Sequence, residues 1–445
     1  MASEQYSPER IEAIKRQNRE YTLFSWSVQN KVDPIVVTGG KGVRFWDASG
    51  KVYLDFSSQL INSNIGHQHP KVVAAIKEQA EKLCFAAPSF ATEVRGELGR
   101  LLAEVSPGNL KKSFLTLGGA EANDNAIKIA RFYTGRHKII SRYRSYHGAT
   151  YGAMTLSGDF RRLPIEPGIP GVVRVFDPYC YRCSFHQEPS TCHLECVSSI
   201  EEVINYEGPD KIAAVIIEGI TGTNGVHVPP PTYVPALRQL CDKYDILLIA
   251  DEVMSGWGRT GEWFSVNHWK VVPDIITTAK GITSGYVPLG AVIMSDKIGE
   301  FFEDKMLWAG LTYNAHTLSC AAAIACINVY KEDRLIENSR EMGQVLAGEL
   351  ARMKERHPSV GDVRSIGLFS CIELVKDRQT REPLVTARDQ SLIANINKFL
   401  LENGVLVVTR LNTIVVAPPL CINRDELLDG LTKVDKALDL ADRAL

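Results

Sequence analysis

Short apolar runs alternate with helical segments through the middle of the chain, and this alternation is the strongest constraint on the fold. Six runs rich in isoleucine and valine occur at 138–143, 172–176, 212–219, 246–253, 274–280 and 289–295. Their length and composition are typical of buried strands, and the segments between them have helical spacing. Alternating strands and helices build a mostly parallel sheet with helices on both faces. The sequence therefore predicts an α/β fold.

The two ends of the chain have a different pattern and predict a second, smaller α/β domain. Residues 40–59 have the pattern of a β-hairpin. The runs 363–374 and 404–420 are strand candidates, and a helix is expected after them. With 445 residues, the chain exceeds the size at which one hydrophobic core keeps growing. We predict a large domain over 66–330 and a small domain built from 1–65 and 331–445.

Composition excludes several classes of partner. A net charge of −2 gives no electrostatic footprint for nucleic acid or for an anionic membrane. The first twenty residues are charged and lack the apolar region of a secretory signal. No run of about 18 apolar residues that could span a bilayer occurs. We therefore expect a cytoplasmic protein with no nucleic-acid or membrane partner.

Three groups capable of binding or chemistry fall at the carboxyl ends of predicted strands, where open α/β sheets collect their ligands. The turn Gly118–Glu121 precedes a helix, and its backbone N–H groups can approach a phosphate. Asp251 ends a buried strand, where a carboxylate needs a cationic or donor partner, such as a protonated ring nitrogen. Lys280 follows another strand, and desolvation there would lower its pKa and make it a nucleophile.

Each of these three signals also has a simpler structural explanation. The glycine turn can be a tight connection without a ligand, and Asp251 can cap the next turn or bind a metal. Lys280 can be a surface lysine at a strand end. The combination and order of the signals carry more information than any one of them.

The order is a phosphate-binding turn, then Tyr146-His147-Gly148, then Asp251-Glu252-Val253, then Lys280. With these motifs in this order, the chain resembles the class III aminotransferases, which depend on pyridoxal 5'-phosphate (PLP) and have PLP fold type I. The stretches that carry the resemblance run through nearly the whole chain. They include NIGHQHPKV, LGGAEANDNAIKIAR, IADEVMSGWGRTGEWF, PDIITTAKGITSGYVPLGAVI and TYNAHTLSCAAA. The sequences of these stretches most resemble those of taurine, ω-amino-acid and amine transaminases.

The resemblance implies roles for individual residues. Lys280 is expected to be the catalytic lysine that binds the cofactor covalently and carries the proton, and Asp251 the partner of the ring nitrogen. Val253 and Tyr146 are expected on opposite faces of the ring. The full set of expected cofactor-binding residues is Gly119, Ala120, Tyr146, His147, Glu218, Asp251, Val253, Lys280 and Thr312. The family commonly has proline after the glutamate, whereas this chain has Gly219.

The family reaction implies a primary amine or ω-amino acid as donor and a 2-oxo acid, pyruvate or 2-oxoglutarate, as acceptor, with ping-pong kinetics. The expected substrate-binding residues are Arg410, Ile61 and Phe85. Arg410 can bind a substrate carboxylate through two hydrogen bonds. Thr312 matches a residue that reaches the phosphate of the neighbouring subunit, so the resemblance implies a homodimer with shared active sites. A PLP-dependent aminomutase, racemase or decarboxylase is the alternative on the same scaffold.

Four of the ten cysteines lie close together in the sequence, at 180, 183, 192 and 196. A C-x-x-C followed by C-x-x-x-C has the form of a structural zinc site, although the spacer is shorter than in common zinc modules. Free thiols and a disulfide are the alternatives. We expect no metal in the active site itself.

Overall fold

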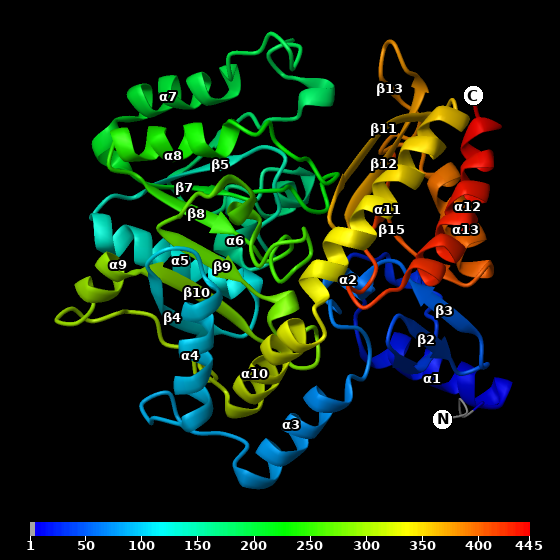
Figure 1. Cartoon of the computed structure of the whole chain (residues 1–445), viewed down its shortest axis with the longest axis horizontal. Coiled ribbons are helices and arrows are strands. Elements are labelled where there is room, and N and C mark those ends of the chain that lie inside the picture. Colours follow the sequence, from blue (N-terminus) through cyan, green and yellow to red (C-terminus); the bar gives the residue numbers. More distant parts are fainter. Residues whose placement is uncertain (1–4) are drawn as a thin grey trace.

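The structure, a computed structural model, describes residues 5–445. Its largest element is a seven-stranded sheet (Figure 1). Four of its six strand pairings are parallel, whereas the strand Gly290–Ser295, next to one edge, is antiparallel to both of its neighbours. The mostly parallel sheet expected from the sequence is confirmed. In spatial order the strands are β4 (Leu110–Thr116), β10 (Gly290–Ser295), β9 (Ile275–Thr278), β8 (Leu247–Asp251), β7 (Ile212–Ile217), β5 (Lys138–Arg142) and β6 (Val172–Val175).

Helices cover both faces of this sheet because successive strand residues point to opposite sides. Ile139, Ile216 and Ile249 pack in one cluster with α5 (Gly119–Thr134). Their sequence neighbours Ile140, Val215, Ile217 and Leu248 pack in another cluster with α7 (Glu195–Glu207) and α8 (Tyr233–Lys243). The sequences of these strands are therefore continuous apolar runs, as is typical of buried parallel strands.

The remaining helices before residue 333 are α1 (Pro8–Tyr21), the short α2 (Ser58–Ile61), α3 (Pro70–Lys82), α4 (Glu93–Val105), α6 (Tyr151–Leu156), α9 (Asp296–Phe301) and α10 (Thr317–Glu332). Toward the β4 edge of the sheet, α4 and α10 contribute to the largest hydrophobic cluster. In Figure 1, α1 lies at the lower right, away from the seven-stranded sheet.

Two smaller sheets are built from the ends of the chain. The first has the order β1 (Val37–Lys41), β2 (Arg44–Asp47), β3 (Val52–Asp55) and β14 (Val405–Leu406). It contains the hairpin expected over 40–59, and it joins the two ends of the chain because β14 pairs with β3 in parallel. The second has the order β11 (Val360–Ile366), β12 (Phe369–Asp377), β16 (Thr413–Val416) and β15 (Val408–Arg410), with β13 (Glu382–Pro383) paired to β12.

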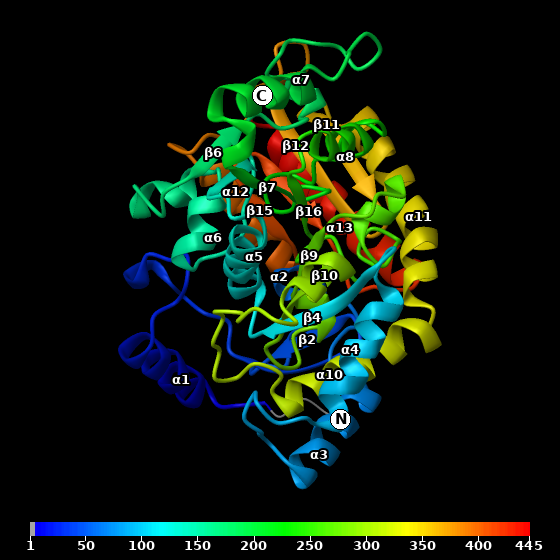
Figure 2. The same cartoon turned by 90° about the vertical axis from the view of Figure 1, so that its left-hand side faces the viewer.

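Three helices accompany the second small sheet, on the right of Figure 1: α11 (Leu335–Arg356), α12 (Ser391–Glu402) and α13 (Arg424–Asp442). The helical segment before residue 357 consists of two helices, because Arg334 adopts a left-handed conformation between α10 and α11. Figure 2 shows the same arrangement from the side. The domain limits at residues 65 and 330 stay a prediction.

Arg259 ties three distant parts of the chain together. Its side chain is fully buried, and its guanidinium donates to the carbonyls of Leu368 and Pro418 at 3.0 and 2.6 Å. It also donates to Ser58 Oγ at 3.0 Å and Asn64 Oδ1 at 2.7 Å. A buried charge needs such partners to offset its desolvation. The arginine of the G-x-G-R-T-G motif is therefore a structural link between both ends of the chain and the large sheet.

Within residues 5–445, no helix combines the length and the apolar character needed to cross a bilayer.

Candidate active site

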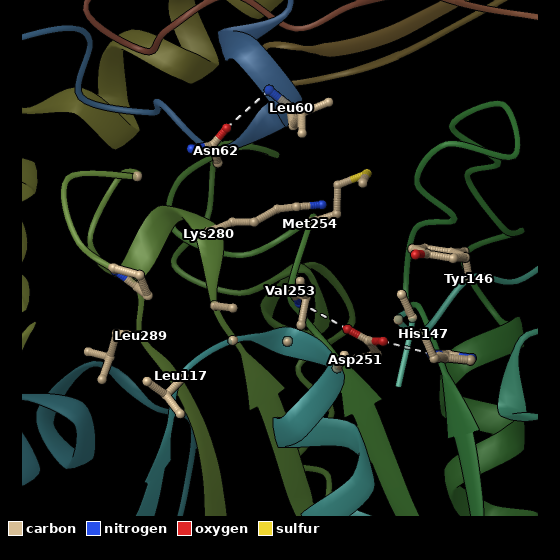
Figure 3. A pocket seen from close by; sticks show the side chains of 18 of the residues that line it. Leu60, Asn62, Leu117, Tyr146, His147, Asp251, Val253, Met254, Lys280 and Leu289 are labelled. Carbon is tan, nitrogen blue, oxygen red and sulfur yellow. Dashed lines mark hydrogen bonds and ion pairs between the residues drawn. The ribbon is translucent and has the colours of Figure 1, made fainter. Parts of the chain in front are cut away.

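A cavity of about 470 Å³ lies at the carboxyl ends of the large sheet's strands, where ligands of open α/β sheets bind. The predicted residues in its wall come from segments that follow the strands, from the end of β8 and from the start of α5 (Figure 3). Lys280 and Asp251 share this cavity. The predicted residues that line it are Gly119, Ala120, Tyr146, His147, Glu218, Asp251, Val253 and Lys280.

The Asp251 carboxylate receives three hydrogen bonds. His147 Nδ1 lies 2.6 Å and Asn123 Nδ2 lies 2.8 Å from its Oδ2, and the backbone N–H of Val253 donates to Oδ1 at 3.0 Å (Figure 3). Because an ionised carboxylate only accepts, His147 Nδ1 is the donor in this pair. Three donors stabilise the charged form, so a buried anion is available at the base of the cavity.

Asn123 is a site residue that was not predicted from the sequence. It lies on the buried face of α5, and its Oδ1 accepts a hydrogen bond from Thr277 Oγ1 at 2.7 Å. That bond orients the amide so that its nitrogen points to Asp251. A polar residue among the buried positions Ala122, Ala126 and Ile127 is the sequence signal that could have identified it, because buried polar groups need partners.

Lys280 begins the short turn that follows β9, with a positive φ of 48°. A non-glycine residue in this region is strained and often has a functional reason to be there. In Figure 3 its side chain extends across the cavity toward Met254, above Val253. Burial, assisted by the charge of Arg161, lowers the pKa of Lys280 to about 8, although Asp251 and Glu218 act in the opposite direction. A larger fraction of this amine is therefore uncharged at neutral pH than in an exposed lysine.

The glycine turn expected to bind phosphate is the N-terminus of α5, which starts at Gly119. The first backbone N–H groups of a helix have no partner within the helix and favour an anion. A Cβ at Gly119 would lie 2.8 Å from Val253 Cγ1, and one at Gly148 would lie 2.5 Å from the Cβ of Ala120. Both glycines therefore allow the walls of the cavity to approach each other closely.

Glu218 accepts hydrogen bonds from the backbone N–H groups of Tyr146 at 3.0 Å and Gly222 at 2.8 Å. Burial raises its pKa, and the neighbouring Asp251 charge adds to that effect. The next residue, Gly219, has a packing reason to lack a side chain, because a Cβ there would lie 2.5 Å from Ser265 Oγ. This contact explains why proline is not accommodated in this chain.

Arg410 lies beside the cavity, but its guanidinium is already paired with another group of the protein. Its guanidinium is paired with Asp159 at 3.2 Å and lies 3.3 Å from Thr223 Oγ1. Arg161, which the sequence reading did not single out, shares both partners and lies 3.6 Å from the ring centroid of Tyr146. Thr223 and Tyr146 line the cavity. Burial and the charge of Arg161 both lower the pKa of Arg410.

Besides Arg410, three predicted residues do not line the cavity of their own chain. Ile61 is buried in a hydrophobic cluster with Ile220 and Phe369, whereas its neighbours Leu60 and Asn62 reach the cavity. We therefore replace Ile61 by Leu60 as the candidate contact from this segment. Phe85 packs near Tyr313, and Thr312 is exposed on the loop before α10.

Comparison with known proteins agrees with this geometry. The sequence model of the family described as aminotransferase class-III matches residues 26–438. The chain belongs to the class III aminotransferases. A leucine/methionine racemase of Thermococcus litoralis is 36% identical to this aminotransferase over 96% of this chain and 95% of its own length. A taurine–pyruvate aminotransferase of Bilophila wadsworthia is 33% identical, covering 94% and 95%.

Solved structures of the family superpose closely on this aminotransferase. A taurine:2-oxoglutarate aminotransferase of Bifidobacterium kashiwanohense, solved with PLP and glutamate, has a TM-score of 0.94 and 42% identity, covering 97% of this chain and 98% of its own. An (S)-enantioselective ω-transaminase of Thermomicrobium roseum has a TM-score of 0.93 and 37% identity, covering 98% and 99%. The fold is therefore PLP fold type I.

The aminotransferase uses PLP and transfers an amino group to a 2-oxo acid. The chemistry of the cavity fits this cofactor. An amine with a lowered pKa suits its aldehyde, a carboxylate held by three donors suits its ring nitrogen, and a helix N-terminus suits its phosphate.

The four clustered cysteines lie in the loop before α7 and on its first turn, and none of them lines the cavity. All are free thiols. Within residues 5–445, the only three candidate ligand atoms within 4.8 Å of one another belong to His357, Asp439 and Asp442, so the geometry does not assemble a cysteine metal site. The loop instead attaches to β12 through an ion pair between Arg182 and Glu373.

Proposed function

We propose that this aminotransferase takes its amino group from an ω-amino acid, a primary amine whose other end carries a sulfonate or carboxylate. Pyruvate or 2-oxoglutarate is the proposed acceptor. The observation that carries the proposal is the pair of guanidiniums beside the cavity, because Arg161 and Arg410 share the single carboxylate of Asp159. One unbalanced positive charge in a mostly buried place favours an anionic ligand.

The names of two relatives support the same class of donor. One is called a taurine–pyruvate aminotransferase and another a taurine:2-oxoglutarate aminotransferase. Taurine carries an amine and a sulfonate at opposite ends, so it needs an amine-binding group and an anion-binding group at a distance. The cavity offers Lys280 for the first and the arginine pair for the second.

We propose the following roles for the residues of this chain. Lys280 would hold the cofactor covalently and would carry the proton that leaves the donor carbon. Asp251 would pair with the protonated ring nitrogen, and His147 and Asn123 hold Asp251 in place. The cofactor, when bound, supplies an electron-withdrawing ring that acidifies the C–H bond of the attached amine. Gly119 and Ala120 hold the phosphate through backbone N–H groups.

One apolar and one aromatic side chain, Val253 and Tyr146, line the proposed ring site. They would hold the cofactor ring between them. The guanidinium carbon of Arg161 lies 3.6 Å from the centroid of the Tyr146 ring. This cation–π contact holds the tyrosine ring in place. Glu218 is held by two backbone N–H groups and is proposed to lie near the ring oxygen.

Racemisation is the second candidate function, because a relative named a leucine/methionine racemase is 36% identical over nearly the whole chain. A racemase returns its substrate with the amino group still attached. An aminotransferase keeps the amino group on the cofactor after the first half-reaction. The absorbance of the cofactor after mixing with donor alone therefore separates the two functions.

A donor half-reaction without acceptor tests the proposal. The panel contains taurine, β-alanine and 4-aminobutyrate as acid-bearing donors, with 1-phenylethylamine as a donor without an acid group. We expect R410L to lower the second-order rate constant of the half-reaction with the acid-bearing donors about 10- to 100-fold, since a hydrogen bond to a charged group contributes about 1.5–3 kcal/mol. R340L removes an exposed arginine that pairs with Glu262 and does not line the cavity, and it is the control. Equal losses with all four donors in R410L would contradict the proposal.

We further propose that the enzyme is a cytoplasmic homodimer. Thr312 is exposed on a loop that also exposes the apolar side chains of Met306, Trp308 and Tyr313. Exposed apolar groups gathered in this way are typical of an interaction surface. A partner subunit covering them would let its own Thr312 reach the phosphate of this chain. All ten cysteines are free, which agrees with a reducing compartment.

A further inference from the structure

The segment 57–62, which brings Leu60 and Asn62 to the cavity, has a strained backbone. Three of its residues have a positive φ: Ser58 at 45°, Gln59 at 61° and Ile61 at 57°. Outside this segment, no four consecutive positions within residues 5–445 contain more than one non-glycine residue of this kind. Residues with a side chain rarely adopt this conformation, and they keep it only where the surrounding structure holds them.

The carboxylate of Asp55 holds the start of this segment. Asp55 is fully buried, and it accepts hydrogen bonds from the backbone N–H groups of Ser57 at 3.2 Å and Gln59 at 3.0 Å. It also accepts from the side chains of Ser57 at 2.8 Å, Gln59 at 2.9 Å and His67 at 2.9 Å. Because an ionised carboxylate only accepts, His67 Nε2 is the donor in its pair. None of these donors lines the cavity, so the bonds of Asp55 fix the conformation of the segment.

Packing of the Leu60 side chain does not hold the segment, because this side chain is 73% exposed. Leu60 lies in the cavity wall above Lys280 in Figure 3. Its backbone N–H donates to Asn62 Oδ1 at 3.0 Å, which closes the turn locally. The place of Leu60 in the wall therefore depends on hydrogen bonds made by its neighbours, and Asp55 accepts the largest number of them.

We infer that Asp55 is a positioning residue of the substrate site, because it holds residues 57–62 in the strained conformation that places Leu60 in the cavity wall. The inference rests on the proposed function and adds a residue that acts on the donor through Leu60. Without these bonds, the segment relaxes to an ordinary conformation and this part of the wall loses its shape. The donor then binds more weakly, whereas Lys280 and Asp251 keep their places.

D55N is the variant that tests the inference. Asparagine keeps the shape of the side chain and one oxygen acceptor, but its amide nitrogen only donates. One oxygen of Asp55 accepts from the backbone N–H groups of Ser57 and Gln59, and the other accepts from the side chains of Gln59 and His67. In either orientation of the new amide, donors therefore face a donor.

The experiment follows the cofactor absorbance of the holoenzyme in the half-reaction with taurine and with 1-phenylethylamine, without acceptor. We expect the apparent dissociation constant of each donor to rise about tenfold in D55N, which corresponds to about 1.4 kcal/mol. The limiting rate per bound cofactor should change less than twofold. D274N is the matched control, because Asp274 is also buried, accepts from the backbone N–H of Leu248 and pairs with Arg238, but does not line the cavity. It should leave both constants unchanged.

Q59A is a milder variant, because Gln59 is only partly buried and its side chain donates to Asp55 alone. We expect a rise of about threefold in the apparent dissociation constants, again with little change in the limiting rate. In D55N/Q59A the rise should be no larger than in D55N, since both changes act through the same hydrogen bonds. If D55N does not fold, the result with Q59A decides.

Unchanged dissociation constants in D55N or in Q59A would overturn the inference. A limiting rate that falls as much as the affinity would also overturn it, and so would additive effects in the double variant. Failure of the proposed function gives a different result. In that case the acid-bearing donor does not react with the wild-type enzyme, and D55N weakens the binding of 1-phenylethylamine alone.

Discussion

At the scale of single residues, the sequence predicted the groups that stand at strand ends and missed those that support them. Lys280 and Asp251 could be identified because each follows an apolar run, and the structure places both in one cavity. Arg161 and Asp159 lie on a loop whose path no periodic pattern predicts. Their proximity to Arg410 depends on how the small sheet packs against the large one, and local sequence does not encode that packing.

The lowered pKa of Lys280 predicts how its reactivity depends on pH. Only the uncharged amine has a lone pair, so the rate at which apoenzyme binds PLP covalently should rise with pH and level off above about 8. An exposed lysine, with a pKa of about 10.4, would give a rate that still rises at pH 10. Stopped-flow absorbance between pH 6 and 10 measures this rate. A rise that continues through pH 9 without a plateau would contradict the assigned environment.

At the scale of elements, the strands were predictable and the details at their ends were not. All six apolar runs of the central segment form strands of the large sheet, because their length and β-branched content suit a buried strand. The break between α10 and α11 has no sequence signal, since the residues around Arg334 contain no glycine or proline. Gly219 differs from the family pattern for a reason visible only in three dimensions, its closeness to Ser265.

The start of α5 offers a test at this scale. G119A should weaken the binding of PLP to apoenzyme about tenfold or more, because the new Cβ would lie 2.8 Å from Val253 and push apart the turn and the ring site. G99A is the matched control, since a Cβ at Gly99 on α4 meets nothing within 4 Å. Its helix should gain about 0.5–1 kcal/mol of stability with no effect on cofactor binding. Fluorescence titration with PLP gives both affinities, and equal values for the two variants would show that the turn is not the phosphate site.

At the scale of the whole molecule, residues far apart in the sequence build the site and hold it. Arg259 joins the segment around Ser58 and Asn64 to the carbonyls of Leu368 and Pro418. The α/β class could be predicted from the sequence pattern, and a small domain shared by both ends stays a prediction from that pattern. The partners of Arg259 could not, because carbonyl positions depend on the finished fold. The proposed second subunit would add residues that lie even farther from the site along the polypeptide.

Mixed dimers test whether active sites are shared. K280A removes the amine from its own subunit's site, whereas T312A is expected to weaken phosphate binding in the partner's site. A hybrid of the two variants would hold one site with both defects and one with neither. Refolded or co-expressed mixtures should therefore regain activity well above the sum of the parent variants. Activity no greater than that sum would contradict a site completed by Thr312 of a second copy.

The central claim is that Lys280 is the residue that holds the cofactor. Reduction of the holoenzyme with borohydride fixes the cofactor to the lysine that carries it, and peptide mass spectrometry then locates the modification. The account predicts a phosphopyridoxyl group on Lys280 and its absence from K280A. A modification on any other lysine of the wild-type enzyme, or none at all after saturation with PLP, would contradict it.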